Sequence, residues 1–152
     1  MEKLLRSSFS FKILNQNDHI LPRKRQDFFY LYWMEKINLS QKLSLFSDYF
    51  NPRITGELNG QLIKLVKFKG EFVWHHHENE DEFFYVVKGS FDMHLRDKII
   101  SIHEGEFLIV PRMMEHKPVA INEVEIMLFE PATTLNTGNI ENELTKKELK
   151  KI

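Results

Sequence analysis

The residues best suited to chemistry lie in segment 74–82, which reads Trp-His-His-His-Glu-Asn-Glu-Asp-Glu. Alternate side chains of a strand share a face, so His75 and His77 project together while His76 points the other way. Two imidazoles side by side form half of a metal site. Glu82 opens the next predicted strand after an acidic turn, and from there its carboxylate could close on the same ion.

A further imidazole is available far along the chain at His116, after a predicted strand that ends in Pro111. Three histidines and one carboxylate form a mixed nitrogen and oxygen set that suits Fe(II), Mn(II), Ni(II), Zn(II) or Cu(II). Such a set usually leaves one or two positions for water or substrate. The hypothesis is therefore one divalent metal ion bound by His75, His77, Glu82 and His116, with no organic cofactor and with the catalytic residues unknown.

Plainer explanations compete with this hypothesis. A histidine triplet beside acids is also typical of a solvated turn, and Glu78, Glu80 and Asp81 fit a solvated loop better than a set of catalytic acids. Parity turns Trp74 away from the ligands, toward the core or a dimer interface. Isolated histidines are more often surface or strand residues than ligands, and these are His19, His94 and His103. Several apolar residues fit either a pocket wall or plain core: Phe84, Val86, Phe107, Ile109 and Met127.

The elements around these residues are predicted to be mostly β-strands. Asn59-Gly60 is a strong hairpin signal between strands 53–58 and 61–68. Further short strands are expected at 71–77, 82–87, 91–95, 99–102, 107–110 and 124–129. This regular spacing indicates a sandwich or a closed barrel, and because no internal repeat is visible we expect one barrel. A short helix is predicted from residue 34 to about residue 50, with a capping box formed by Asn38 and Gln41.

Composition excludes several classes of protein. The net charge of -1 gives no overall field that would favour nucleic acid or an anionic membrane, so neither is an expected partner. The chain has no cysteine, which removes disulfides and thiolate chemistry and fits a reducing, cytoplasmic location. No apolar run reaches the length needed to span a bilayer.

Two stretches of the chain resemble the paired motifs of the cupin superfamily. Gly70, His75, His77, Glu82 and Gly89 follow the first motif, with one residue fewer after the first glycine. Gly105, Pro111 and His116 follow the second motif, in which Met113 replaces a turn glycine and Ala120 replaces an asparagine. The resemblance covers roughly residues 53–131 and implies a small single-domain, all-β protein. Its expected fold is a double-stranded β-helix, or jelly-roll, barrel, often dimeric, with the four-ligand metal site inside.

The resemblance leaves the function open among three classes. The first is a metalloenzyme acting on a small oxygen-bearing metabolite, by dioxygenase-like or sugar-phosphate-isomerase-like chemistry. The second is a non-catalytic module that binds or senses a small ligand, and the third is a storage-like barrel. The intact ligand set argues against the third. The strand that ends in Glu130-Pro131 is followed by Leu135-Asn136-Thr137-Gly138. This arrangement also resembles small members of the superfamily that carry the sugar-phosphate isomerase label.

The predicted organisation has three parts. Residues 1–33 form an extension that we expect to be dispensable, with a targeting or interface segment as the alternative. Residues 34–138 form the barrel with its leading helix, and residues 139–152 form a polar tail. The tail is predicted to be a loop followed by a frayed helix. Met34 is a candidate start of the domain, because helix and strand patterns begin only there.

Overall fold

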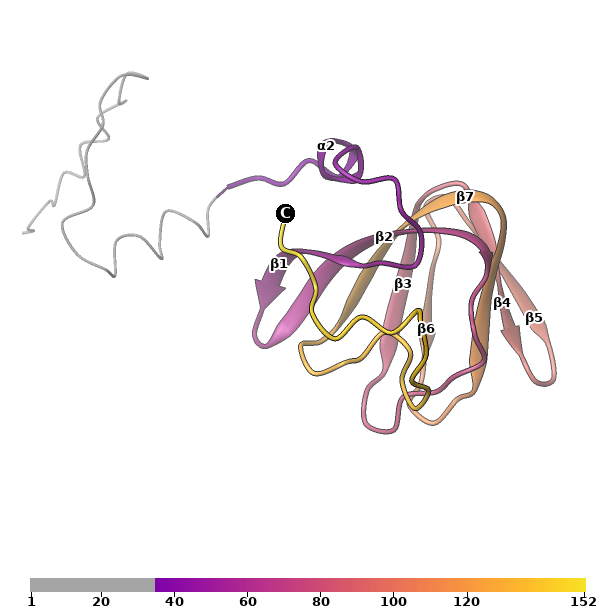
Figure 1. Ribbon diagram of the computed structural model, residues 1–152. Helices are drawn as coiled ribbons and strands as arrows, with labels where there is room; N and C mark the ends of the chain where they lie inside the picture. Colours follow the sequence, from indigo (N-terminus) through magenta and orange to yellow (C-terminus); the bar gives the residue numbers. More distant parts are fainter. Residues whose placement is uncertain (1–34) are drawn as a thin grey trace, which may run out of the picture. The chain divides into compact units, whose positions relative to one another are not determined.

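The computed structural model describes residues 35–152, so the predictions for residues 1–33, including the one for His19, lie outside the described residues. The described part contains one short helix and seven strands (Figure 1). Helix α2 spans Leu39–Leu43. The strands are β1 (Arg53–Leu58), β2 (Gln61–Glu71), β3 (Glu82–Lys88), β4 (Ser90–Leu95), β5 (Ile99–His103), β6 (Phe107–Val110) and β7 (His116–Pro131).

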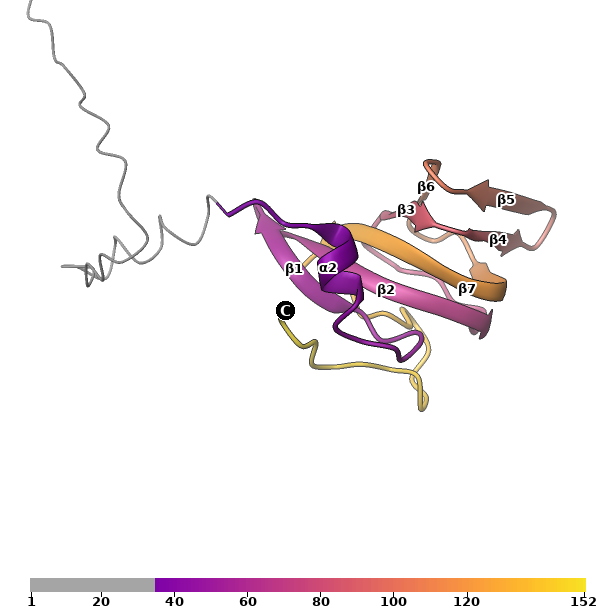
Figure 2. The same cartoon turned by 90° about the horizontal axis from the view of Figure 1, so that it is seen from above.

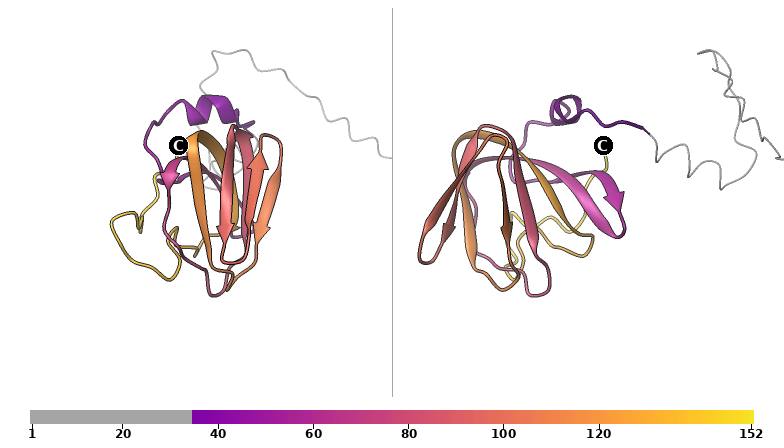
Figure 3. Two further views of the ribbon diagram at one scale, coloured as in Figure 1. Left: turned by 90° about the vertical axis from the view of Figure 1, so that its right-hand side faces the viewer. Right: turned by 180° about the vertical axis from the view of Figure 1, so that it is seen from behind.

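Strand β7 organises the sheet, because it pairs with three other strands. Its second half lies between β2 and β3, and its first half pairs with β4. All pairings between named strands are antiparallel, with the order β1-β2-β7-β3-β6 and with β4 joining β5 and β7. Figure 3 shows the result, in which the β4–β5 hairpin and the long strands curl around a common interior. The predicted all-β, jelly-roll fold of the cupin type with a short leading helix is confirmed.

The interior of this barrel is built from alternate residues of the strands, as the period of two requires. On β3, Phe84 and Val86 are buried, and on β7 the buried residues include Val124, Ile126 and Leu128. The ligand candidate Glu82 continues the inward row of β3. A single alternation therefore sends apolar side chains to the middle of the barrel and polar ones to its end.

The helix is shorter than predicted. Its cap is as expected, since the Asn38 side chain accepts a hydrogen bond from the Gln41 N–H at 3.1 Å. The helix nevertheless ends at Leu43 rather than near residue 50. Phe50 has a φ of 54° and is only 8% exposed. Tertiary packing brings the Phe50 ring against Phe68 and Phe72, and this turn of the backbone ends the apparent helical pattern. In Figure 2 the helix lies over β1 and β2.

Two strand boundaries also differ from the prediction. Strand β2 runs through Gly70 with a bulge, because the glycine takes a φ of 88°, and segment 72–77 keeps only one bridge, from His75 to His116. Pro118, which has no N–H, lies opposite this segment and interrupts the ladder. Strand β7 begins at His116 rather than at residue 124, and the break predicted at Asn122 is an exposed bulge within the strand.

The C-terminal residues form turns, and the predicted frayed helix is not present in them. We call residues 132–152 the C-terminal strap. Its far end joins the edge of β1, where the Ile54 N–H donates to the Lys150 carbonyl and the Ile152 N–H donates to the Ile54 carbonyl, both at 3.0 Å. Leu144 packs against the core. Within residues 35–152 no helix is long and apolar enough to cross a membrane.

Candidate metal centre

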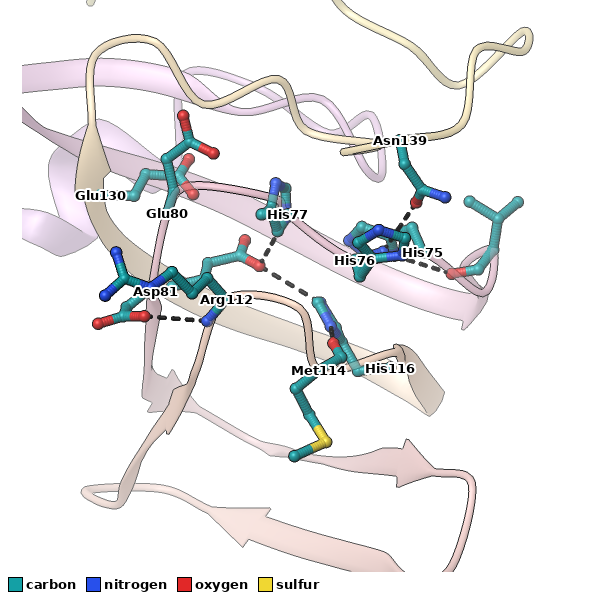
Figure 4. Close-up of polar contacts among 12 residues, drawn as sticks. His75, His76, His77, Glu80, Asp81, Arg112, Met114, His116, Glu130 and Asn139 are labelled. Carbon is teal, nitrogen blue, oxygen red and sulfur yellow. Dashed lines mark hydrogen bonds and ion pairs between the residues drawn. The ribbon is translucent and has the colours of Figure 1, made fainter.

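Four polar side chains meet inside the barrel: His75, His77, Glu82 and His116. One ligand atom of each lies within 4.8 Å of all the others, and the residues are between 0% and 5% exposed. Ligands of one ion at about 2.2 Å stand at most about 4.4 Å apart, so small side-chain movements suffice for them to share an ion. His76 is half-buried and takes no part in the cluster, as parity predicts (Figure 4).

Backbone pairing places the two halves of this cluster side by side. The His75 N–H donates to the His116 carbonyl at 3.0 Å, and the His116 N–H donates back to the His75 carbonyl at 2.9 Å. The Met113 N–H donates to the His77 carbonyl at 2.7 Å. These bonds bring together histidines far apart in the sequence, which explains how His116 reaches the first pair.

The imidazole tautomers suit metal binding. Nδ1 of His75 lies 3.0 Å from the Val73 carbonyl, and Nδ1 of His116 lies 2.8 Å from the Met114 carbonyl. A carbonyl only accepts hydrogen bonds, so each Nδ1 carries the proton. In the neutral ring the Nε2 lone pair is then free for a metal, the usual outer-shell arrangement of metal-binding histidines.

The centre lacks partners for its own polar atoms. Nε2 of His77 and Nε2 of His116 lie 3.2 and 3.4 Å from Oε2 of Glu82, and all three atoms are buried without a hydrogen-bond partner. When the His116 ring is neutral, its lone pair faces a carboxylate oxygen, and that contact is repulsive. A cation among these atoms removes the repulsion. The four residues therefore fit a metal ion.

The electrostatics agree with this fit. Burial lowers the pKa of His75 to about 4, and the neighbouring His116 ring lowers it further against the opposing effect of Glu82. His75 is therefore neutral at pH 7, as a ligand must be. Burial alone would raise the pKa of Glu82, but positive charge at the Nε2 side of His116 and His77, a role that a bound cation would take, outweighs burial and holds that pKa below its ordinary value. The carboxylate is therefore ionised.

A pocket of about 20 Å³, enough for about one water, opens beside the cluster. Its polar lining is His75, Glu82 and Asn136, and its apolar lining includes four phenylalanines: Phe50, Phe68, Phe72 and Phe84. Phe84 therefore belongs to the core and also lines the pocket, the two roles that the sequence analysis left open for it. Two further pocket candidates, Phe107 and Ile109 on β6, instead face outward and are 61% and 53% exposed.

A buried ion pair adjoins the centre, and no pattern in the sequence predicted it. Lys64 on β2 and Glu130 on β7 are each 1% exposed, and their ion pair measures 2.7 Å. Phe83 pairs with Phe129, so the next inward residues, Glu82 and Glu130, are neighbours across β3 and β7. Oε2 of Glu130 has no partner. Burial, followed by the charge of Glu82, raises the pKa of Glu130 to about 7.

The other candidate residues lie around the centre without joining it. Oδ1 of Asp81 accepts the Arg112 N–H at 2.9 Å, and Oε1 of Glu80 accepts the Thr133 hydroxyl at 3.2 Å. Glu78 and His103 are exposed, and neither they nor His94 belong to the metal-type cluster of the described residues. Trp74 is half-buried and carries the Arg96 guanidinium 3.9 Å above its ring.

Comparison with known proteins places this centre in a family. Residues 64–130 match the family model Cupin_2, described as a cupin domain. The chain is 44% identical to a cupin-2 domain containing protein from Shewanella frigidimarina NCIMB 400, with a TM-score of 0.62 over 62% of this chain and 93% of that one. It is 32% identical to protein NMB1881 from Neisseria meningitidis, with a TM-score of 0.60 over 64% of this chain and 100% of that one.

A curated relative matches over a shorter stretch. The uncharacterized protein YdbB of Bacillus subtilis (strain 168) is 32% identical over 62 residues, which are 40% of this chain and 55% of that protein. The match thus spans about half the length of the relative. Together with the fold, these similarities show that the chain belongs to the cupin family, as a small single-domain member with a buried His/Glu cluster compatible with metal binding.

Proposed function

We propose that His75, His77, Glu82 and His116 bind one divalent metal ion, which is Fe(II), Mn(II), Ni(II) or Zn(II). The observation that carries this proposal is the set of buried, unpartnered ligand atoms, Nε2 of His77, Nε2 of His116 and Oε2 of Glu82. A buried polar atom without a partner costs on the order of 1–3 kcal/mol. Three such atoms within reach of one point are costly unless a cation joins them.

The protein is proposed to be a metal-dependent enzyme that acts on a small oxygen-bearing metabolite, by dioxygenase-like or isomerase-like chemistry. A metal ion held there supplies Lewis-acid activation of a substrate oxygen or, if it is iron, a site for oxygen chemistry. The chain's own residues orient the reactants. Aromatic walls at Phe68, Phe72 and Phe84 exclude water, while Asn136 and Glu82 add polar groups at the pocket edge.

The alternative is a non-catalytic cupin that binds or senses a small ligand. The small size of the pocket favours it, because about 20 Å³ holds little more than a water unless side chains move. The buried Glu130 beside Glu82 favours the enzyme, because a carboxyl group next to the ligand shell is suited to holding or moving a proton.

Elemental analysis tests the metal proposal, using protein purified without an affinity tag and then reconstituted separately with the four metals. One metal per chain for at least one of them is expected. No bound metal under any condition would end the proposal. Oxygen-uptake assays and a sugar-phosphate screen with the loaded protein then separate the enzyme from the binding module, since a binding module stabilises a ligand-bound state without turnover.

A homodimer is proposed as the assembly. Phe107 and Ile109 expose apolar side chains on β6, and the Phe83 ring stacks on Phe107 at 5.2 Å between centroids. Within the described residues β6 pairs only with β3, so its other edge is unpaired. An exposed apolar edge strand is suited to pairing with another chain. The cytoplasmic location stays a prediction.

A further inference from the structure

The C-terminal strap contacts the segment that supplies two of the proposed ligands. The Asn139 N–H donates to the His76 carbonyl at 3.0 Å, and the Asn139 Oδ1 accepts the His76 N–H at 2.9 Å. Both backbone groups of His76 are thus held by one strap residue, and Figure 4 shows the bond made by the Asn139 side chain. This reciprocal pair does for His76 what a neighbouring strand would do, in a segment with no regular strand partner on that side.

Gly138 makes this approach sterically feasible. It has a φ of 53°, and a Cβ placed on it would lie 2.1 Å from the His76 carbonyl oxygen and 3.3 Å from Nδ1 of His77. Any side chain at this position would push the strap away from the ligand segment. The glycine is therefore required both by its backbone conformation and by the contact itself.

The strap closes a set of backbone bonds around residues 75–77. His116 holds both backbone groups of His75, Asn139 holds both groups of His76, and Met113 holds the carbonyl of His77. Because His76 lies between the two ligands, fixing its backbone fixes the direction in which its neighbours project. The strap itself is secured near this point, since the Asn136 side chain pairs with the Leu144 carbonyl and the Lys146 N–H.

We infer that Gly138 and Asn139 are positioning residues for the metal centre, which hold His75 and His77 in register for the ion. The inference rests on the proposed metal binding. It also gives a role to the sequence ending Leu135-Asn136-Thr137-Gly138, in which the glycine permits the contact and the asparagine that follows makes it. Loss of a group that orients metal ligands typically weakens metal affinity about 10–100-fold.

The test measures Mn(II) and Ni(II) affinity in full-length protein with single substitutions in the strap. Asn139→Ala should weaken binding about 10–100-fold. Asn139→Asp keeps the oxygen that accepts the His76 N–H, so it should recover most of the lost affinity. Asn142→Ala is the matched control, because Asn142 also bonds strap backbone, at Leu144, but does not contact the ligand segment. Asn142→Ala should bind metal like the parent.

A glycine pair gives a second comparison. Gly138→Ala should lose at least as much affinity as Asn139→Ala. Gly60→Ala introduces similar strain at a φ of 78° but has nothing within 4 Å, so it should leave affinity unchanged. If Gly138→Ala does not fold, the Asn139 series carries the test alone.

Two measurements separate positioning from general destabilisation. Urea midpoints of metal-free Asn139→Ala and Asn142→Ala should be similar, while hydrogen exchange of the His76 amide should be faster only in Asn139→Ala. A parent protein that binds none of the four metals would overturn both the proposed function and this inference. A parent that binds metal, together with an Asn139→Ala variant that binds it equally tightly, would overturn only the inference.

Discussion

The direction in which a side chain projects decides the proposed ligand set more sharply than sequence proximity does. His76 lies between two proposed ligands, yet it is half-buried and absent from the cluster, while His116 is distant in sequence and fully buried within it. The difference follows from the alternation of side chains along an extended segment.

The first prediction uses this contrast between neighbouring histidines. His116→Ala removes one imidazole and should reduce metal affinity at least about 10-fold, on the order of the effect of losing an outer-shell group. His76→Ala is the control and should keep the metal content of the parent. Metal per chain by elemental analysis, with thermal melting before and after a chelator, measures both. Equal metal loss in the two variants would show that the parity argument is wrong.

A second residue-scale prediction concerns Met113, which has a φ of 65° where the related motif has a glycine. The left-handed conformation costs a non-glycine residue about 1–2 kcal/mol. Glycine avoids this cost, but it loses more backbone entropy on folding, which offsets part of the gain. Met113 is 65% exposed, so little packing is lost on substitution. Met113→Gly should therefore raise the free energy of unfolding by roughly 0.5–1 kcal/mol.

The neighbouring residue provides the control for this prediction. Met114 is 43% exposed and has no positive φ, so Met114→Gly should lower the stability instead. Urea unfolding of the metal-free proteins measures both changes. The left-handed strain at Met113 would be refuted by a Met113→Gly variant that loses as much stability as Met114→Gly.

The third prediction follows from the raised pKa of Glu130. The ordinary value of 4.5 applies to the unfolded chain, while the folded metal-free protein raises this pKa to about 7. Between these values the folded state keeps a proton that the unfolded chain has released. The stability contributed by this proton is present below about pH 4.5 and is lost as the pH rises through about 7.

Comparison with Glu130→Gln isolates this contribution, because glutamine does not titrate. The free energy of unfolding of the parent minus that of the variant should fall as the pH rises from 4.5 to 7. Urea titrations of metal-free protein across this range measure the difference. A difference independent of pH would show that Glu130 keeps its ordinary pKa in the folded state.

At the scale of elements, the Lys64–Glu130 pair joins β2 to β7 inside the barrel, with both side chains removed from solvent. Replacing a buried ion pair with apolar groups is often neutral, whereas removing one partner leaves a buried charge. Lys64→Met at pH 8 should therefore lower the free energy of unfolding by about 3 kcal/mol, because Glu130 loses the ammonium that lowers its pKa and stays buried either as an unpaired charge or with a proton taken from solution.

The double variant tests whether the cost comes from the unpaired charge. Lys64→Met with Glu130→Leu should recover most of the stability, because neither charge then remains. Urea unfolding at pH 8 measures the series. If the double variant is no more stable than Lys64→Met alone, the explanation by an unpaired Glu130 carboxyl is wrong.

At the scale of the whole molecule, the exposed apolar side chains of β6 predict that the protein forms a dimer. Light scattering should give the parent about twice the chain mass of 18.2 kDa. Ile109→Asp places a charge on the proposed interface and should yield monomers. Ile121 is 86% exposed on the bulge of β7, so Ile121→Asp should leave the assembly unchanged. A monomeric parent at micromolar concentration would contradict the proposed dimer.

The sequence by itself determined the β-rich fold and the candidate ligands. Alternation around His75 and His77 and the turn at Asn59-Gly60 are local patterns, which neighbouring residues fix. His116 was placed with them by the resemblance to the paired cupin motifs. A local pattern, the capping box of Asn38 and Gln41, also identified the Asn38 cap. The helical pattern failed at Phe50, which it placed on the helical face but which lies beyond the end of the helix and packs on Phe68 and Phe72.

Only the tertiary structure decided what surrounds the ligands. Lys64 lies in a strand among apolar residues, and Glu130 lies at the end of another, so nothing local indicates that they are buried together beside Glu82. In the sequence, Gly138 ends the predicted barrel and Asn139 begins the predicted polar tail, and only the fold shows that both contact His76. Such contacts depend on which strands become neighbours, and a one-dimensional pattern records the face of each side chain but not its partner across the barrel.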